Sequence, residues 1–256
     1  MKISLITATF CCATTVGDCL ASVARQTHRD IEHIVIDGAS TDQTLPILQQ
    51  HRSELATLVS EPDGGVYDAL NKGLALCTGD AVGVLHGDDV LADERVLERI
   101  AAAFTDPAVV ACYGDLVYVA KHNPARVVRY WRAGEFSEKR LRRGWMPPHP
   151  TFYARRSLYE HAGGFDTDFR IAADYEFMLK MLSAATGKIA YLPEVLVRMR
   201  TGGLSNRSLG NLLQKSREDY RAIRRHRMGG VGTLVCKNIF KIGQFAARPP
   251  NEPGKT

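Results

Sequence analysis

The sequence predicts an α/β protein with a mostly parallel central sheet flanked by helices. Short apolar runs of strand length alternate with segments whose apolar residues recur at helical spacing, and this alternation is typical of βαβ units. The run from Ala81 to Leu85 is apolar on both faces, as expected of a strand buried in a parallel sheet. Two adjacent carboxylates, Asp88 and Asp89, follow it. They would lie at the edge where open α/β sheets bind their ligands.

The first half of the chain alternates regularly between the two kinds of segment. Strands are expected at 3–8, 33–36, 56–60, 81–85 and 109–113. Apolar residues at helical spacing predict intervening helices with the sets Val16, Leu20 and Val23; Leu45 and Leu48; Val66, Leu70, Leu74 and Cys77; and Val96, Ile100 and Phe104. The first two helices also carry capping-box spacing at their starts, Thr15 with Asp18 and Ser40 with Gln43.

The second half is less regular. Strand-like runs occur at 116–119, 127–131 and 151–154, and a helix is expected from Ala173 to Leu182. The segment 144–150 is too rich in proline for a helix, and 202–206 has the composition of a loop. A helical stripe runs through Leu209, Leu212, Leu213, Ser216, Tyr220 and Ile223.

The composition is that of a soluble globular protein. Of its 256 residues, 45% are apolar and 24% charged, which is ordinary for a globular domain. No apolar run is long enough to span a bilayer, and the N-terminus has no signal-peptide pattern. The six cysteines form no C-x-x-C pair, so we expect free thiols in a reducing cytosol.

The carboxylates at the predicted strand ends indicate a metal–diphosphate site. Asp88 and Asp89 would repel each other unless a cation or hydrogen-bond donors satisfy them, and Mg²⁺ commonly takes one or two carboxylates together with substrate phosphates. The alternative is that they cap the next helix. Asp37 follows another strand and could hold a nucleoside, or it could be an ordinary Asp-Gly turn residue.

Several motifs of other nucleotide-binding or hydrolytic enzymes are absent from the sequence. The first strand is followed by Thr9-Phe10-Cys11-Cys12 rather than by G-x-G-x-x-G, which argues against a dinucleotide-dependent dehydrogenase. There is also no P-loop and no G-x-S-x-G nucleophile motif. These absences leave a nucleotide site built from strand-end carboxylates as the favoured interpretation.

The chain resembles family 2 glycosyltransferases, and most closely those that assemble bacterial polysaccharides and glycolipids. The resemblance covers about residues 1–206 and rests on the order and spacing of seven segments: 3–9, 37–42 (DGASTD), 63–73 (DGGVYDALNKG), 87–89 (GDD), 149–152 (HPTF), 163–166 (GGFD) and 173–176 (ADYE). It implies a GT-A fold, in which a nucleotide-sugar-binding half (1–115) joins an acceptor half (116–225). It also implies inverting transfer from a nucleoside-diphosphate sugar, helped by Mg²⁺ or Mn²⁺.

The resemblance also implies roles for single residues. Thr7, Thr9 and Asp37 would line the nucleoside pocket, with Asp63 and Asn71 at its edge. Asp88 would face ribose or metal, Asp89 would hold the metal on the diphosphate, and His149 would touch acceptor or diphosphate. Asp174 matches the family's catalytic base. Two residues depart from the family's pattern: Ala173 stands where Glu is usual, and His86 stands where Asp is common, so the metal site would depend chiefly on Asp89.

The chemistry of sugar transfer agrees with these roles. A divalent cation neutralises the charge of the leaving diphosphate, and a carboxylate on the opposite side of the sugar can deprotonate the acceptor hydroxyl. Asp174, like the other aspartates, also has a structural alternative. It could serve only as a carboxylate in the first turn of a helix. Two other functions stay open: a sugar nucleotidyltransferase, and a non-catalytic nucleotide-sugar-binding protein.

The last segment, 226–256, is predicted to be a basic amphipathic tail. Val231, Leu234, Val235, Ile239, Ile242 and Phe245 fall on one helical stripe, Lys237 and Lys241 lie off it, and an arginine cluster precedes it. This pattern is typical of an interfacial helix on an anionic membrane, although a helix docked on the protein's own core has the same pattern. We expect peripheral attachment to the inner face of the cell membrane, a saccharide or lipid-linked acceptor, and no nucleic-acid partner.

Overall fold

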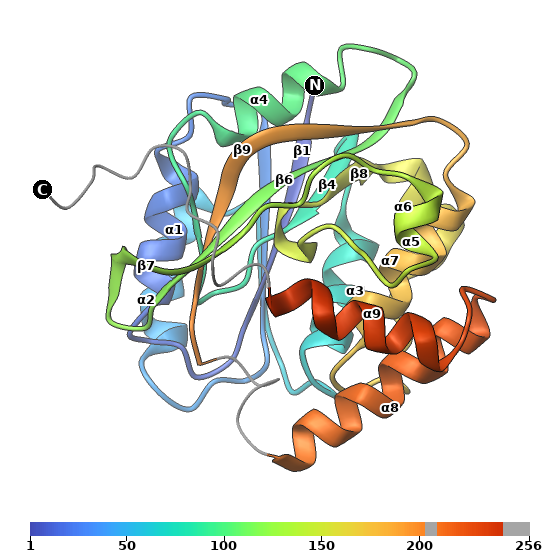
Figure 1. Ribbon diagram of the computed structural model, residues 1–256. Coiled ribbons are helices and arrows are strands. Elements are labelled where there is room, and N and C mark those ends of the chain that lie inside the picture. The colour runs from blue at the N-terminus through green and yellow to red at the C-terminus, as the bar shows by residue number, and fades with distance from the viewer. Residues whose placement is uncertain (203–208, 243–256) are drawn as a thin grey trace, which may run out of the picture.

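Across residues 1–202 and 209–242, which the computed structural model describes, nine strands form one curled sheet with helices on both faces (Figure 1). The strand order is β3-β2-β1-β4-β8-β6-β9-β5, and β7 pairs with β6 outside this path. The predicted α/β class is confirmed.

Four parallel strands form the first half of the sheet. They are β1 (Ile3–Thr9), β2 (Ile31–Asp37), β3 (Thr57–Ser60) and β4 (Ala81–Val84). Their connections are α1 (Val16–Ala24), α2 (Thr44–Gln50) with the short 3-10 helix η1 (Arg52–Glu54), and α3 (Val66–Leu76). Because these strands are parallel, their carboxyl ends reach the same edge of the sheet, as the sequence predicts.

The second half of the sheet is mixed. β8 (Tyr153–Arg155) pairs antiparallel with both β4 and β6 (Val109–Ala120), and β7 (Asn123–Trp131) pairs antiparallel with β6. β9 (Lys188–Arg200) runs parallel to β6, and its end pairs antiparallel with the two-residue β5 (Val90–Leu91). Two expectations need correction here. The runs at 109–113 and 116–119 are one strand, and β9 was not expected.

Six helices belong to this half: α4 (Val96–Ala103), α5 (Glu138–Leu141), α6 (Arg156–Ala162), α7 (Ala173–Ala184), α8 (Leu209–Arg225) and α9 (Val231–Ile242). A 3-10 turn, η2 (His149–Thr151), takes up part of the segment expected as a strand at 151–154. Residues 203–208 lie outside the described ranges, and they include most of the loop that was expected at 202–206.

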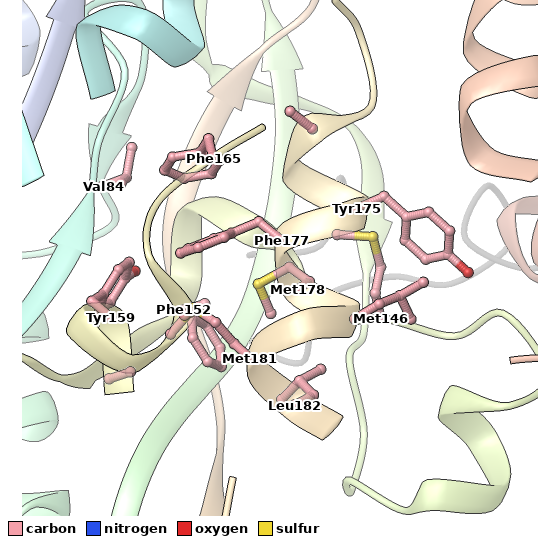
Figure 2. Packing of buried hydrophobic residues seen from close by; sticks show 14 of the residues in the cluster. Val84, Met146, Phe152, Tyr159, Phe165, Tyr175, Phe177, Met178, Met181 and Leu182 are labelled. Carbon is pink, nitrogen blue, oxygen red and sulfur yellow. The ribbon is translucent and has the colours of Figure 1, made fainter. Parts of the chain in front are cut away.

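Apolar side chains on both faces of the sheet pack against these helices. Ile6, Ile36 and Val84 face the side covered by α3, α6 and α7, whereas Leu5, Val35 and Ala81 face the side of α1, α2 and α4. Figure 2 shows the first cluster, in which Phe165 lies between Val84 and the α7 residue Phe177. The Phe165 and Phe177 ring centroids are 4.3 Å apart, so the loop before α7 is tied into the core.

The capping box expected at Ser40 does not form. The Ser40 hydroxyl donates to Asp37 Oδ1 instead, and α2 begins four residues later, where Asp42 Oδ1 accepts from the backbone N–H of Thr44. Thr15 precedes α1 as expected, but its hydroxyl donates to the Cys12 carbonyl and caps nothing. In both cases a nearby acceptor competes for the hydroxyl.

Helix α9 packs against the protein with the face that carries Thr233, Lys237 and the partly buried Leu234. Thr233 and Lys237 are buried, and the Lys237 Nζ donates to Asp219 of α8 at 2.5 Å. Lys237 is therefore not part of an exposed basic belt as the sequence suggested, because its charge is neutralised inside the protein. None of the helices in the described ranges has both the length and the apolar character needed to cross a membrane.

Candidate active site

The carboxyl ends of β1 and β2 form a polar corner around Asp37. Thr9 and Asp37 are register partners, and Asp37 is fully buried. Its carboxylate accepts hydrogen bonds from the Thr9 hydroxyl (3.1 Å), the Ser60 hydroxyl (2.7 Å), and the backbone N–H and hydroxyl of Ser40. These donors hold the Asp37 carboxylate in one orientation at the strand end, where a nucleoside site was expected.

Asp63 lies against the same corner. A Cβ added to Gly38 would sit only 2.5 Å from Asp63 Oδ2, so only glycine fits at 38 without moving that carboxylate. The other oxygen, Asp63 Oδ1, accepts from the backbone N–H of Gly65 at 2.8 Å. The structure thus brings together Thr9, Asp37 and Asp63 of the predicted nucleoside residues.

Thr7 is placed differently. It is fully buried, and its hydroxyl lies 2.9 Å from Nε2 of His33 inside the protein. Burial lowers the pKa of His33 to about 4, so this imidazole is neutral at pH 7. His33 also lines a cavity of about 150 Å³ beside α1, which holds none of the predicted site residues.

The turn after β4 presents Asp88 and Asp89 in different environments. Asp89 is 1% exposed; its Oδ1 accepts from the backbone N–H of Arg200 at 3.1 Å, and its Oδ2 is buried without a hydrogen-bond partner. Burial, and then the charge of Asp88, raise the pKa of Asp89 well above its usual value. Asp88 is half-buried, and its carboxylate accepts no hydrogen bond from the described part of the chain.

Arg200, at the end of β9, fixes this turn. Its guanidinium donates to the Asp88 carbonyl (2.7 Å) and to Asp18 Oδ2 (2.5 Å), while its backbone N–H donates to Asp89. This contact could not be predicted from the sequence, because residues 111 apart meet only once β9 has joined the sheet.

The two carboxylates suit a divalent cation that is shared with a substrate. Within the described ranges no three His, Cys, Asp or Glu side chains converge on one point, so the chain offers no closed metal cage. Mg²⁺ and Mn²⁺ often use one or two carboxylates and take the remaining oxygens from substrate phosphates and water. The open Asp88 carboxylate and the unpartnered Asp89 Oδ2 are oxygen donors of that kind.

Asp174 lies in the first turn of α7, near two imidazoles. The rings of His86, after β4, and His149, in η2, are 6.3 Å apart. Burial lowers the pKa of both histidines, that of His149 to about 4, although the charge of Asp174 acts in the opposite direction. The half-buried Asp174 carboxylate therefore has neutral ring nitrogens near it.

The loop that leads to Asp174 is held by helix α3. The Asn71 amide donates to the Phe165 carbonyl and accepts from the Phe165 N–H, at 2.9 and 2.8 Å. One turn earlier on α3, the Tyr67 hydroxyl donates to the Ile171 carbonyl at 2.9 Å. Asn71 was expected at the edge of the nucleoside pocket. In the structure its amide fixes the chain between α6 and α7.

Helix α8 supplies a further support that the sequence did not reveal. Glu218, which is 8% exposed, accepts hydrogen bonds from the backbone N–H groups of Arg170, Ile171 and Ala172, just before α7 begins. A carboxylate is favoured there by the unpaired N–H groups and by the helix dipole. Glu218 thus caps the helix that carries Asp174.

Comparison with protein families gives one match over most of the chain. The model of the family described as "Glycosyl transferase family 2" matches residues 4–172. A similar curated protein is the PGL/p-HBAD biosynthesis glycosyltransferase of Mycobacterium bovis (strain BCG / Pasteur 1173P2). It is 32% identical over 209 residues, which cover 79% of this chain and 78% of that protein.

Solved structures share the fold. S. aureus TarS 1–349 in complex with UDP-GlcNAc matches with a TM-score of 0.70 at 19% identity, over 94% of this chain and 71% of that one; the longer TarS chain is covered to 44%. The mannosyltransferase PcManGT of Pyrobaculum calidifontis, in complex with GDP-Man and Mn²⁺, matches with a TM-score of 0.66 at 19% identity, over 96% and 73% of the two chains. The expected GT-A architecture is confirmed by these likenesses.

Proposed function

Because the chain belongs to glycosyl transferase family 2, we propose that it is an inverting enzyme that uses a nucleoside-diphosphate sugar. Its acceptor would be a saccharide or a lipid-linked saccharide in bacterial cell-surface polysaccharide or glycolipid synthesis. The observation that carries the proposal is the meeting of three groups at one sheet edge: the Asp37 corner, the Asp88–Asp89 turn, and Asp174 on the capped helix α7.

The donor's nucleoside would bind at the corner formed by Thr9, Asp37 and Asp63. Asp37 is already held by four donors, so it would act mainly by shaping the corner. The Asp63 Oδ1 atom accepts from the N–H of Gly65, and its Oδ2 atom could accept a hydrogen bond from the base or the ribose. Nucleotide sugars are the ligands named for two neighbours of the same fold.

Asp88 and Asp89 would hold Mg²⁺ or Mn²⁺. When bound, the cation would neutralise the charge that develops on the departing diphosphate. The chain's own part is to supply carboxylate oxygens at a fixed strand end, and Arg200 keeps the turn in place. A neighbour of this fold was solved with Mn²⁺.

Asp174 would be the general base. As the acceptor oxygen bonds to the anomeric carbon, the bond from that carbon to the diphosphate oxygen breaks, and the acceptor's proton passes to the Asp174 carboxylate. The nucleoside diphosphate leaves with the electron pair. His149 and His86, which are neutral at pH 7, could hydrogen-bond to the acceptor or diphosphate without competing for that proton.

The two alternatives differ from this proposal in their products. A sugar nucleotidyltransferase would release pyrophosphate from a nucleoside triphosphate and a sugar phosphate. The loop after β1 lacks the Gly- and Lys-rich sequence that would suit a triphosphate. A non-catalytic binding protein would not need a general base, and so would not need an aspartate at position 174.

The decisive experiment is a panel of nucleotides and nucleotide sugars, each with and without Mn²⁺. Thermal shifts identify the donor, because a ligand that binds only the folded state raises its stability. Release of nucleoside diphosphate in the presence of membrane extracts or saccharides then measures transfer. We expect stabilisation by one nucleoside-diphosphate sugar, enhanced by Mn²⁺, followed by release of the diphosphate. Formation of pyrophosphate, or tight binding without turnover, would overturn the proposal.

A further inference from the structure

Helix α9 is oriented with its apolar side toward solvent. Val231, Val235 and Ile239 follow one another at intervals of four residues, so they lie on one face of the helix, and their side chains are 64, 51 and 59% exposed. Phe240 adds a fourth apolar side chain at 45%. The opposite side of the helix carries Thr233 and Lys237, which are buried, and the partly buried Leu234. This is the reverse of the usual arrangement for a surface helix.

Polar contacts hold the helix in this orientation. Lys237 Nζ donates to Asp219 at 2.5 Å and lies 3.2 Å from the centroid of the Tyr175 ring. The Thr233 hydroxyl donates to the carbonyls of Arg142 and Met228. A Cβ added to Gly144 would come within 2.7 Å of the Thr233 carbonyl, so the two backbones are in close contact. Rotating the helix to bury its apolar face would break all of these contacts.

The part of the chain that contains α9 is basic. Residues 220–251 contain seven Arg or Lys and no Asp or Glu. Arg142, Arg143, Arg224 and Arg227 are exposed beside α9, and in the described part of the chain none of the four has an acidic partner. An apolar face with a cationic border is the pattern of a segment that lies in the interface of an anionic bilayer.

We propose that the exposed face of α9, together with these four arginines, docks the enzyme on an anionic lipid bilayer. Two copies of the chain would bring two basic borders together, and a nucleic acid would leave the apolar side chains without a partner. At 12 residues, the helix is about 18 Å long and would lie in the interface rather than cross it.

The helix that carries the docking face packs against the helix that carries the candidate base. Lys237 of α9 covers Tyr175, the residue that follows Asp174, and Figure 1 shows α9 running across the end of the molecule that carries α7 and α8. Docking would therefore bring Asp174 near the membrane surface. This part of the inference rests on the proposed function, because it requires an acceptor that is anchored in lipid.

Vesicle co-sedimentation of the full chain tests the inference. Vesicles of phosphatidylcholine alone are compared with vesicles that contain phosphatidylglycerol. We expect binding to the anionic vesicles only, with salt reducing it because exposed charges are screened over about 8–10 Å. The double variant Val235→Asp/Ile239→Asp should bind at least ten times less. Its matched control is Val128→Asp/Leu76→Asp, which changes exposed apolar residues on β7 and α3 and should bind like the wild type.

A second pair of variants tests the charges separately. Arg142→Glu/Arg143→Glu should lower binding by roughly fivefold or more for each residue, whereas Lys121→Glu/Arg126→Glu, with the same change of charge on another exposed segment, should not. Equal binding of all variants, or equal binding to both kinds of vesicle, would overturn the inference. The inference would also be overturned if the wild type sediments as a dimer without lipid and Val235→Asp/Ile239→Asp sediments as a monomer. Thermal shifts with nucleotide sugars on the same preparations report donor binding independently.

Discussion

Asn71 and Phe165, which are 94 residues apart in the chain, exchange two hydrogen bonds between the Asn71 side-chain amide and the Phe165 backbone, at 2.9 and 2.8 Å. The contact ties helix α3, in the first half of the chain, to the loop that precedes the candidate base. Phe165 also packs on Phe177 of α7, with ring centroids 4.3 Å apart. The position of Asp174 therefore depends on a residue that belongs to the other half of the sheet.

Asn71→Ala should lower turnover more than donor affinity. It leaves the N–H and carbonyl of Phe165 without partners, which costs about 2–3 kcal/mol of unfolding free energy. Turnover and donor KM are measured together with chemical unfolding. Asn71→Asp, which keeps the acceptor but loses the donor, should have about half the effect. A rise in donor KM with unchanged kcat would instead return Asn71 to the nucleoside pocket.

Asp174→Asn should abolish most of the transfer while leaving donor binding intact. Asn keeps an acceptor for the N–H of Tyr175, to which Asp174 now bonds at 2.7 Å, so α7 should begin as before. General-base catalysis contributes roughly a hundred- to ten-thousand-fold, and we expect a loss in that range. Thermal shift with the donor is the control. Transfer close to the wild-type rate would leave Asp174 only a structural role.

Replacing Asp88 and Asp89 by Asn should affect metal binding and stability differently. Asp88→Asn should remove the enhancement of donor binding by Mn²⁺ and raise the melting temperature only slightly, because it relieves the repulsion of Asp89 and breaks no hydrogen bond in the described ranges. Asp89→Asn removes a buried charge that lies beside another carboxylate. It should therefore raise the melting temperature of the metal-free protein and abolish turnover.

Isothermal titration with Mn²⁺ in the presence of nucleoside diphosphate separates these effects. If both variants keep wild-type Mn²⁺ dependence, the cation binds elsewhere or is not used. If Asp89→Asn lowers the melting temperature, the attraction between the Asp89 charge and Arg200 outweighs the cost of burying that charge.

Glu218→Ala should destabilise α7, the helix that carries the candidate base, although Glu218 lies on α8. It leaves three N–H groups at 170–172 without an acceptor, and we expect a loss of about 3 kcal/mol in unfolding free energy. Glu218→Gln keeps one acceptor oxygen and should lose about 1 kcal/mol. Gln214→Ala, which removes only a neighbour of Glu218 on the same helix, is the matched control and should lose less. Equal losses for the three variants would contradict the capping role.

Acid should destabilise the protein through His33. Burial lowers the pKa of His33 in the folded protein to about 4, below the unfolded value of about 6.5. The unfolded chain therefore takes up the proton first as the pH falls, so stability that is present above pH 6.5 is lost between about 6.5 and 4. The contribution is about 2–3 kcal/mol between pH 7 and 4.5. Urea unfolding of His33→Gln should show a smaller pH dependence by that amount, and an unchanged dependence would contradict it.

The parallel strands in the first half of the sheet could be predicted from the sequence, because each contains a short apolar run that is followed by a polar residue. The run at 81–85 located Asp88 and Asp89 correctly at the edge of the sheet. Strand β9 could not be found in this way, since Pro193 and Glu194 interrupt its apolar residues. Gly114 hid the continuity of β6, where a side chain would clash with Leu196.

The contacts that hold the site in place could not be predicted from sequence patterns, because they depend on which helices and strands pack together. A helical stripe shows that α9 is amphipathic, but it does not say which side faces the protein. Lys237 can be buried because its ammonium group pairs with the Asp219 carboxylate and lies over the Tyr175 ring. Glu218 is likewise one acidic residue among many until α8 packs against the start of α7.

The pairing of β5 with the end of β9 sets the order in which the enzyme can mature during synthesis. Val90 and Leu91 pair with Arg198 and Val197, and Asp89 meets Arg200, which is translated 111 residues later. At about 5–20 residues per second, the ribosome needs roughly 5 to 20 s to supply that strand. Until then the turn at Asp88 and Asp89 lacks its partner strand. The nascent chain can complete its first parallel strands early, but its chemistry is assembled among the last events of folding.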